Sequence, residues 1–334
     1  MHLSRIELRF ALFCDKIIRD KDVENMNKSK NFKSSFCLSL TAIIWGVAFV
    51  FQSMGNNYMQ PFTFNAARNL LGCLVLVPLV LLRLKKPALF GGEVKPINKR
   101  ITILGGICCG LALATAGMFQ QYGVKYTTVG KAGFITTLYI ILTPIFGLLL
   151  RKKCHFTVWI GAVGAVIGLY MLCITESLSL SVGDLLVFIC AIFFAVHILI
   201  IDYFSPKTDG VLLSCIQFFV CAITCGVIAL IIEHPSWEQL TQGLIPILYT
   251  GIMSSGVAYT LQIIGQKNFN PTIAALIMSL ESVISAVASY FAWRMGFLTQ
   301  DQSMSAVQII GCVVMFCSVI FVQLPFDKLS RRKH

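Results

Sequence analysis

Charged residues are scarce in this sequence, since only 13% of its 334 residues are Asp, Glu, Lys or Arg. A soluble domain of ordinary composition carries about 25%. Here 57% of the residues are hydrophobic and the mean hydropathy is +0.79. This balance excludes a typical soluble domain and predicts a membrane protein whose chain crosses the lipid bilayer several times.

The chain also lacks the motifs of several enzyme classes. No H-x-x-x-H pair, paired-aspartate motif, G-x-S-x-G elbow or P-loop occurs in it. We therefore expect a protein that is not an enzyme and not an ATP-driven pump, with a membrane-embedded enzyme as the less favoured alternative. Most of the 13 cysteines lie in apolar runs without the spacing of a zinc site. They predict free thiols, no metal and no other cofactor.

Ten apolar runs are long enough to cross a bilayer, which takes about 20 helical residues. Backbone groups in lipid must be hydrogen-bonded internally, so each run is expected to form an α-helix. The runs are too long and too continuously apolar for the strands of a β-barrel. The predicted spans are residues 35–54, 62–84, 101–121, 127–150, 156–174, 183–202, 211–232, 243–265, 271–293 and 304–323.

Basic residues predict the orientation of these spans. With the N-terminus inside, nearly all of the 27 Lys and Arg residues fall on the inside. Lys125 and Arg294 fall outside, and Arg68 and Lys131 lie within spans. This asymmetry indicates cytoplasmic N- and C-termini and supports the span count. The net charge of +12 is then a topology signal, so we expect no nucleic-acid binding.

The chain divides into two similar halves of five spans each. We expect a polar cytoplasmic segment at 1–34, repeats at 35–174 and 183–323, and a basic cytoplasmic tail at 324–334; Met1 and Met26 are both candidate starts. Because five is odd, the second repeat enters the membrane from the opposite face. Inverted repeats of this kind occur in secondary transporters, which bind substrate near the midplane.

Two offsets align the halves. A shift of 149 residues places Trp45 on Phe194 and Arg68 on Gln217. A shift of 142 places Tyr139 on Glu281 and also aligns several identical pairs, in which Gln120, Gly123, Lys125, Ala132, Ile135 and Leu138 match Gln262, Gly265, Lys267, Ala274, Ile277 and Leu280.

Several segments resemble the EamA-type units of the drug/metabolite transporter superfamily, among them TAIIWGVAFVFQ, PFTFNAARNLLGCLVL, YGVKYTTVGKAGFITTLYIILTPIFGLLL, GDLLVFICAIFFAVHIL and AALIMSLESVISAVASYFAW. The resemblance covers about residues 35–323. It implies a ten-helix protein of the cytoplasmic membrane that exports amino acids, other metabolites or drugs. Two features depart from the family pattern: Arg151–Lys153 stand where the first unit often ends in Gly-Glu, and Ser282 stands where a proline commonly follows the acid.

Glu281 is the foremost candidate for a functional residue. It is about the eleventh residue of its span, and therefore about 15 Å deep at 1.5 Å per residue. A charge at this depth is costly and usually faces a pathway. A carboxyl group that gains and loses a proton there is a candidate proton carrier, so proton coupling is a hypothesis. The alternative is a permanently protonated acid that serves packing. Ser285 follows on the same helix face.

Arg68 is predicted to lie about 10 Å below the outer surface, and its role has three interpretations. It pairs with Glu281, holds a carboxylate or phosphate of a substrate, or extends to the outer headgroups. Lys131, nearer the outer edge, is expected to extend to the headgroups. His197 is either a proton relay or a packing residue. The remaining candidates line a cavity or bond a neighbouring helix: Trp45, Gln120, Tyr139, Gln217, Tyr259, Gln262 and Ser285.

These observations favour a secondary transporter that moves a small organic solute by alternating access. A facilitative permease or channel-like uptake protein is the alternative. The glycine stripe GAVGAVIG at 161–168 predicts close helix packing at the edge of the bundle. The chain is expected to be a monomer or a homodimer.

Overall fold

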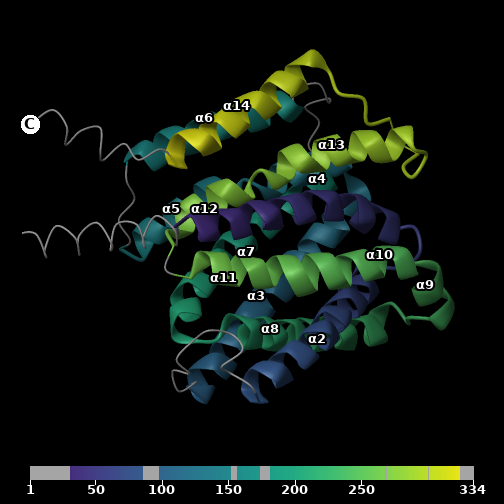
Figure 1. The fold of residues 1–334 in the computed structure, drawn as a ribbon. Helices are drawn as coiled ribbons and strands as arrows, with labels where there is room; N and C mark the ends of the chain where they lie inside the picture. The colour runs from purple at the N-terminus through teal and green to yellow at the C-terminus, as the bar shows by residue number, and fades with distance from the viewer. Residues whose placement is uncertain are drawn as a thin grey trace, which may run out of the picture.

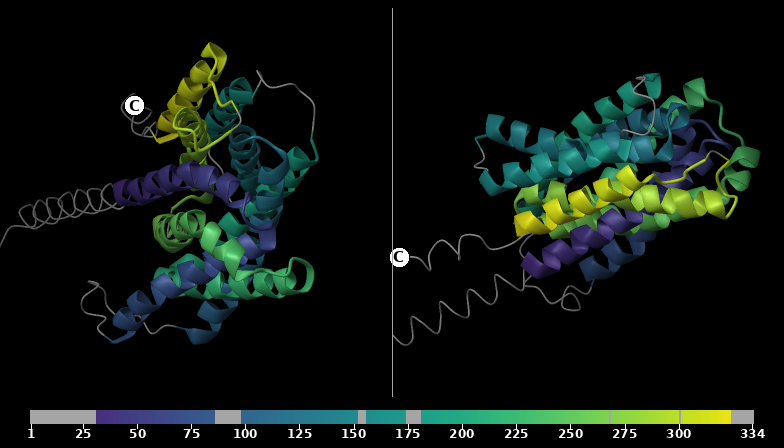
Figure 2. Two further views of the ribbon diagram at one scale, coloured as in Figure 1. Left: turned by 90° about the vertical axis from the view of Figure 1, so that its right-hand side faces the viewer. Right: turned by 90° about the horizontal axis from the view of Figure 1, so that it is seen from above.

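The computed structural model describes residues 31–85, 98–151, 156–173, 181–267, 269–299 and 301–323. Within these ranges the chain is helical and contains no strand. The helices pack side by side in one bundle and are tilted relative to one another (Figure 1, Figure 2). Residues 1–30 of the expected N-terminal segment, and the expected basic tail from 324, lie outside the described residues.

The first half contains the N-terminal helix and five further helices. Their bounds are Asn31–Gly55 for the N-terminal helix, then α2 Pro61–Lys85, α3 Lys99–Tyr126, α4 Val129–Thr136, α5 Tyr139–Leu149 and α6 Phe156–Cys173. The second half contains α7 Val182–Phe204, η2 Ser205–Lys207, α8 Gly210–Ile232, α9 Trp237–Gln242, α10 Leu244–Leu248, η3 Tyr249–Tyr259, α11 Thr260–Gln266, α12 Pro271–Met278, α13 Glu281–Arg294 and α14 Ala306–Gln323.

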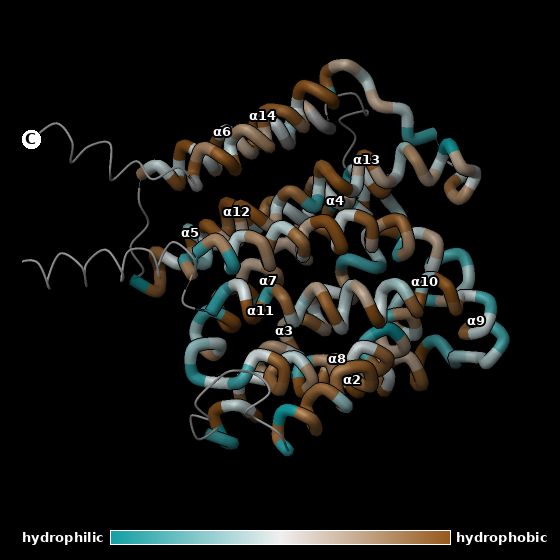
Figure 3. Tube along the Cα trace, in the orientation of Figure 1, coloured by the Kyte–Doolittle hydropathy of each residue, from teal (hydrophilic) through white to brown (hydrophobic). Residues whose placement is uncertain are grey.

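Eight helical segments of the described chain are long and apolar enough to cross a bilayer. Figure 3 shows hydrophobic colour over their central parts and hydrophilic colour mainly at the two ends of the bundle. Two further apolar helices, α6 and α14, have shorter apolar stretches within the described residues. The all-helical membrane fold predicted from composition is therefore confirmed.

Several contacts between the two halves occur twice. Where a helix of the first half packs against a helix of the second, the two equivalent helices also pack against each other, with the halves exchanged. α3 packs against α7, and in the second half α11 packs against the N-terminal helix, where Gly265 abuts Leu38. α3 also packs against α8, and η3 against α2; α4 packs against α13, and α5 against α12. α2 and α6 pack against their own counterparts, α8 and α14. This pattern is the one expected when a two-fold axis relates the two halves.

The fourth helix of each half is interrupted at its centre. Thr137 and Leu138 separate α4 from α5, and Ser279 and Leu280 separate α12 from α13. The N–H groups of Leu138 and Leu280 bond to carbonyls three residues earlier, at 3.2 and 3.3 Å. The hydroxyls of Thr137 and Ser279 also donate to carbonyls three residues earlier. Such bonds compete with the regular helix ladder, so each of these two predicted spans consists of two helical pieces joined by a two-residue turn.

Polar side chains join α2 to α8 at both ends. Glu233, which follows α8, accepts hydrogen bonds from the N–H groups of Phe62 and Thr63 at 3.0 and 2.7 Å. It thereby satisfies the free donors at the start of α2. At the opposite ends Arg83 forms an ion pair with Asp209, whose carboxylate also accepts from the first N–H groups of α8. These contacts fasten one half to the other.

α6 and α14 form an antiparallel pair at the edge of the bundle (Figure 1). A Cβ atom at Gly161 would lie 2.0 Å from the side chain of Val322, and one at Gly168 would lie 2.6 Å from the Gly311 carbonyl. Glycine therefore permits this approach. The stripe gives the predicted close packing, and α14 of the same chain covers it.

Candidate functional site

Tyr139 and Glu281 meet at the centre of the molecule. Each is the first residue after the break in its fourth helix, and the Tyr139 hydroxyl donates to Oε1 of Glu281 at 3.0 Å. Both are buried, with 2% and 3% of their surface exposed. The alignment of the halves pairs these two positions, and two equivalent positions touch only where the two-fold axis passes. This hydrogen bond is therefore where a two-fold axis relating the halves is expected to pass.

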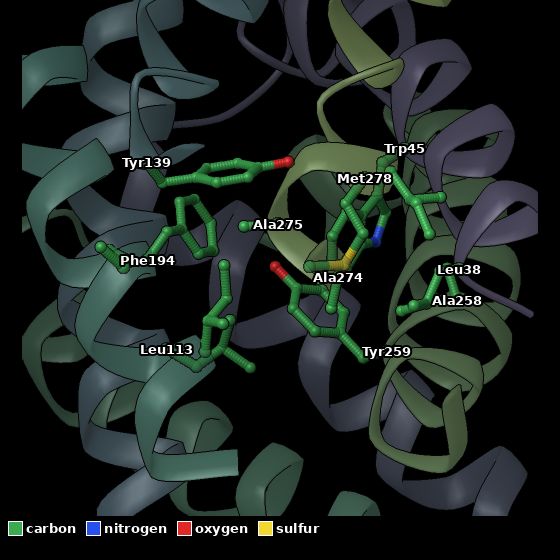
Figure 4. Packing of buried hydrophobic residues seen from close by; sticks show 14 of the residues in the cluster. Leu38, Trp45, Leu113, Tyr139, Phe194, Ala258, Tyr259, Ala274, Ala275 and Met278 are labelled. Atoms are coloured by element: carbon green, nitrogen blue, oxygen red, sulfur yellow. The ribbon is translucent and has the colours of Figure 1, made fainter. Parts of the chain in front are cut away.

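A narrow cavity lies beside this pair. Its free space in this conformation suits water-sized molecules rather than an organic solute. Figure 4 shows Trp45, Tyr139, Phe194 and Tyr259 around one space, with the hydroxyls of both tyrosines directed into it. Most of the predicted site residues line this cavity, namely Trp45, Arg68, Gln120, Tyr139, Tyr259 and Glu281.

Arg68 reaches the cavity from α2 and is only 3% exposed. No ion pair joins it to Glu281 or to another acid among the described residues, and its Nε has no hydrogen-bond partner there. The predicted pairing with Glu281 is thus not formed. Burial also excludes the interpretation that Arg68 extends to the headgroups. A buried guanidinium without a counter-ion is costly, which indicates a position for an anionic group.

The π-helix η3, Tyr249–Tyr259, shapes one wall of the cavity. It places Ser254 and Tyr259 on the lining, while the Ser255 hydroxyl donates to Asn69 of α2 at 3.3 Å. π-helical turns are rare in proteins overall, and those that occur are often found at functional sites. The aligned segment of the first half belongs to the regular helix α3, so the two halves differ at this point.

The other predicted residues lie outside the cavity. His197 Nε2 and Gln217 Oε1 are 3.1 Å apart, and the His197 ring stands edge-on to Tyr259 with centroids 6.0 Å apart. Both polar residues are fully buried just behind the cavity wall. Gln262 is buried further along the same helical segment as Tyr259, and Ser285 bonds within its own helix, α13.

An ion pair with an aspartate holds the Lys131 side chain inside the bundle. Its Nζ lies 3.0 Å from Oδ2 of Asp184, and 17% of the lysine side chain is exposed. Asp184 also accepts from the Thr127 hydroxyl at 2.6 Å and forms a capping box with Ser181 at the start of α7. The expectation that Lys131 extends to the headgroups is wrong, because this ion pair holds it against α7.

Several residues that line the cavity are not among the predicted site residues, although the sequence contains a signal for most of them. Gln52 continues the helix face of Trp45 and Phe49, and Phe194 is the residue that the 149-residue shift places on Trp45. Thr136 precedes Tyr139 by one turn. Ser254 carries no such signal, since the π-helix changes the register of side chains around it.

Comparisons with known proteins identify the family. The family model for EamA-like transporters matches residues 33–174 and again residues 181–324, which is most of the chain. The chain belongs to the EamA-like transporter family. Each half of this EamA-family chain therefore corresponds to one family unit, and the resemblance stated from its motifs is confirmed.

Relatives and a solved structure agree with this assignment. An uncharacterized transporter of Archaeoglobus fulgidus is 29% identical over 88% of this chain and 87% of its own. The uncharacterized transporter YoaV of Bacillus subtilis is 22% identical over 87% of this chain and 96% of its own. A crystal structure with 18% identity matches 89% of this chain and 98% of its own with a TM-score of 0.67, which shows the same fold. The protein is a multi-pass membrane transporter with a small-molecule substrate.

Proposed function

We propose that this chain is a secondary transporter that carries a small organic solute across the cytoplasmic membrane by alternating access. In this proposal α6 and α14 complete ten spans, and both termini are cytoplasmic. The exchanged contacts between the halves support it, because an axis in the membrane plane would place the two broken helices and their cavity at mid-depth. The family resemblance favours export.

The solute carries an anionic group in this proposal, and Arg68 binds it. The supporting observation is the buried guanidinium in the cavity wall, which has no ion pair among the described residues. A guanidinium offers a planar fork of donors that matches a carboxylate or a phosphate. Trp45 and Tyr259, whose ring centroids are 4.5 Å apart, provide an aromatic surface for the apolar part of the solute.

Glu281 carries the proton that couples transport to a pH gradient. It lies at the centre of the two halves, accepts one hydrogen bond from Tyr139 and forms no ion pair within the described chain. A carboxyl group in this position can be protonated in one conformation and deprotonated in the other as water reaches it from alternate sides. A facilitative permease, the second candidate, would move the solute without this step.

Reconstituted protein tests the anion site. Thermal-shift screening of purified protein against amino acids, nucleosides, organic phosphates and cationic drugs first identifies a solute that binds. Arg68→Gln should abolish saturable flux of an anionic solute, and Arg68→Lys should retain part of it. Arg294→Gln, which removes an exposed arginine at the end of α13, is the matched control. Equal flux in Arg68→Gln and Arg294→Gln would overturn the assignment.

A second variant tests proton coupling. Glu281→Gln should lose flux driven by a pH gradient and keep solute binding, because the amide retains the shape of the side chain and cannot be deprotonated. Glu238→Gln, at an exposed position of α9, is the control. Unchanged driven flux in Glu281→Gln would favour the facilitative permease.

A further inference from the structure

A set of buried polar side chains continues from the central cavity toward one end of the bundle. We call this set the inner polar file. Its members come from α7 and the η2 turn after it, from α8 and from α11, and they are His197, Ser205, Ser214, Gln217, Gln262 and Gln266. Each of them is at most 1% exposed. The file ends beside Lys207 and Lys267, the end assigned above to the cytoplasm.

The members of the file come from elements that meet at one junction. α11 packs against α7, η2 and α8. His197 of α7 contacts Gln217 of α8, and Ser214 lies one helical turn before Gln217 on the same face. On α11, Gln262 and Gln266 are four residues apart and therefore share a face. The three helices thus bring buried polar side chains to one junction.

Most polar atoms of the file have no partner in the protein. Unpaired atoms within the described chain are His197 Nδ1, Gln217 Nε2, Ser214 Oγ, Ser205 Oγ, Gln262 Oε1 and both side-chain polar atoms of Gln266. Buried polar groups in native proteins almost always have a partner, either protein or water. Leaving this whole set unpaired would cost a large part of the stability of a folded protein.

Buried polar side chains in the opposite half of the bundle form more direct hydrogen bonds. There Gln121 Nε2 donates to the Gln52 carbonyl at 2.9 Å and to Asn56 Oδ1 at 2.8 Å, and Asn65 Nδ2 donates to the Gly117 carbonyl at 3.0 Å. Gln121 and Asn65 thus each form a direct bond between helices there, although their side-chain oxygens and Gln52 Oε1 are unpaired within the described residues. In the inner polar file, one contact between His197 and Gln217 is the direct side-chain bond that the described residues show.

We infer that the inner polar file holds a chain of internal water molecules that connects the central cavity with the end of the bundle beside Lys207 and Lys267. The polar atoms are numerous enough to give each water the two to four partners that a buried water needs. The connection begins at His197, whose ring borders Tyr259 of the cavity wall. The inference stands on the unpaired atoms and does not depend on which solute the protein carries.

A water chain of this kind has a consequence for the site. It connects the cavity beside Glu281 with the water at the end of the bundle beside Lys207 and Lys267. The path itself remains too narrow for an organic solute. Protons and solute can then reach the centre by separate routes. An apolar cluster next to the file, formed by Cys109, Ile201, Phe204, Leu213 and Ile263, limits its width.

Radiolytic hydroxyl-radical labelling in ¹⁸O water tests this inference in the full-length protein. Radicals form at the waters themselves, so a buried side chain beside an internal water is labelled and a dry one is not. His197 should be labelled, after correction for intrinsic reactivity, although none of its surface is exposed. Ile201, Leu213 and Ile263 are the controls, since each is buried in the apolar cluster on one of the same three helices.

The Gln266→Leu variant adds a second arm. It removes polar atoms at the end of the file at nearly constant side-chain volume, and labelling of His197 should be lost. Tyr259, which borders the cavity, should stay labelled and thereby report an intact fold. An unlabelled His197 in the native protein would overturn the inference, as would equal labelling of His197 and the three controls. So would undiminished labelling of His197 in a folded Gln266→Leu protein.

Discussion

Removing the hydroxyl of Tyr139 should destabilise the protein, and removing the carboxyl of Glu281 as well should restore much of the loss. The two groups share a hydrogen bond of 3.0 Å at sites that are 2% and 3% exposed. Tyr139→Phe leaves a buried carboxyl without this donor, and Glu281→Leu leaves a buried hydroxyl without this acceptor.

The expected magnitude follows from the burial of the pair. A buried polar group that loses its partner costs about 1–3 kcal/mol, whereas replacing both partners by apolar groups of similar shape can be nearly neutral. Each single variant should therefore lower the free energy of unfolding by about 1–3 kcal/mol. The double variant should be destabilised by less than the sum, with a coupling energy of about 1–3 kcal/mol.

Equilibrium unfolding in mixed micelles, followed by denaturant titration, measures all four proteins of the cycle. The double variant should remain folded but lack transport driven by a pH gradient, because it has no carboxyl group to carry the proton. Stability and function are thereby separated. Additive single effects, within about 0.5 kcal/mol, would refute the hydrogen bond as the link between the two halves.

Three further predictions concern the contacts between helices. Mild oxidation by copper phenanthroline and oxygen should form a disulfide between Cys73 and Cys215, whose sulfur atoms are 3.7 Å apart. This disulfide should stop flux, because it ties α2 to α8. A cross-linked protein with full flux would contradict the requirement that the halves move. Gly110→Ala should lower stability by about 1–3 kcal/mol, because the new Cβ would lie 2.6 Å from Cβ of Val220; thermal unfolding checks this, and an unchanged midpoint would show that α3 and α8 are farther apart. Glu233→Ala should cost about 1–2 kcal/mol through loss of the cap on α2, measured as a lower unfolding midpoint than that of an exposed control, Glu238→Ala.

The sequence predicts the outline of the site because two kinds of signal are strong. Hydropathy predicts ten spans, of which eight are long and apolar enough to cross a bilayer within the described residues, and the 142-residue shift pairs Tyr139 with Glu281. In the sequence alignment, this pairing places a tyrosine opposite a glutamate and therefore indicates an asymmetry between the halves. The structure adds that the pair is in contact, because the alignment relates positions that a two-fold axis brings together.

Other features could not be predicted because they depend on how each helix is rotated. A helix that is apolar on most sides does not reveal which way a single arginine or lysine points. Arg68 therefore has three interpretations from the sequence, and the sequence places Lys131 at the headgroups although its side chain contacts Asp184. The π-helix that presents Ser254 leaves no periodic signal in the sequence, since the residues around it are uniformly small or apolar.

Counterflow in proteoliposomes tests the central claim most directly. A solute identified by binding is supplied in labelled form outside and in unlabelled form inside, and its initial rate of entry is measured. A carrier with one central site at Arg68 and Glu281 predicts a rate that saturates with concentration, rises when unlabelled solute is present on the opposite side, and falls to background in Arg68→Gln. A rate that grows linearly with concentration and does not respond to solute on the opposite side would contradict alternating access.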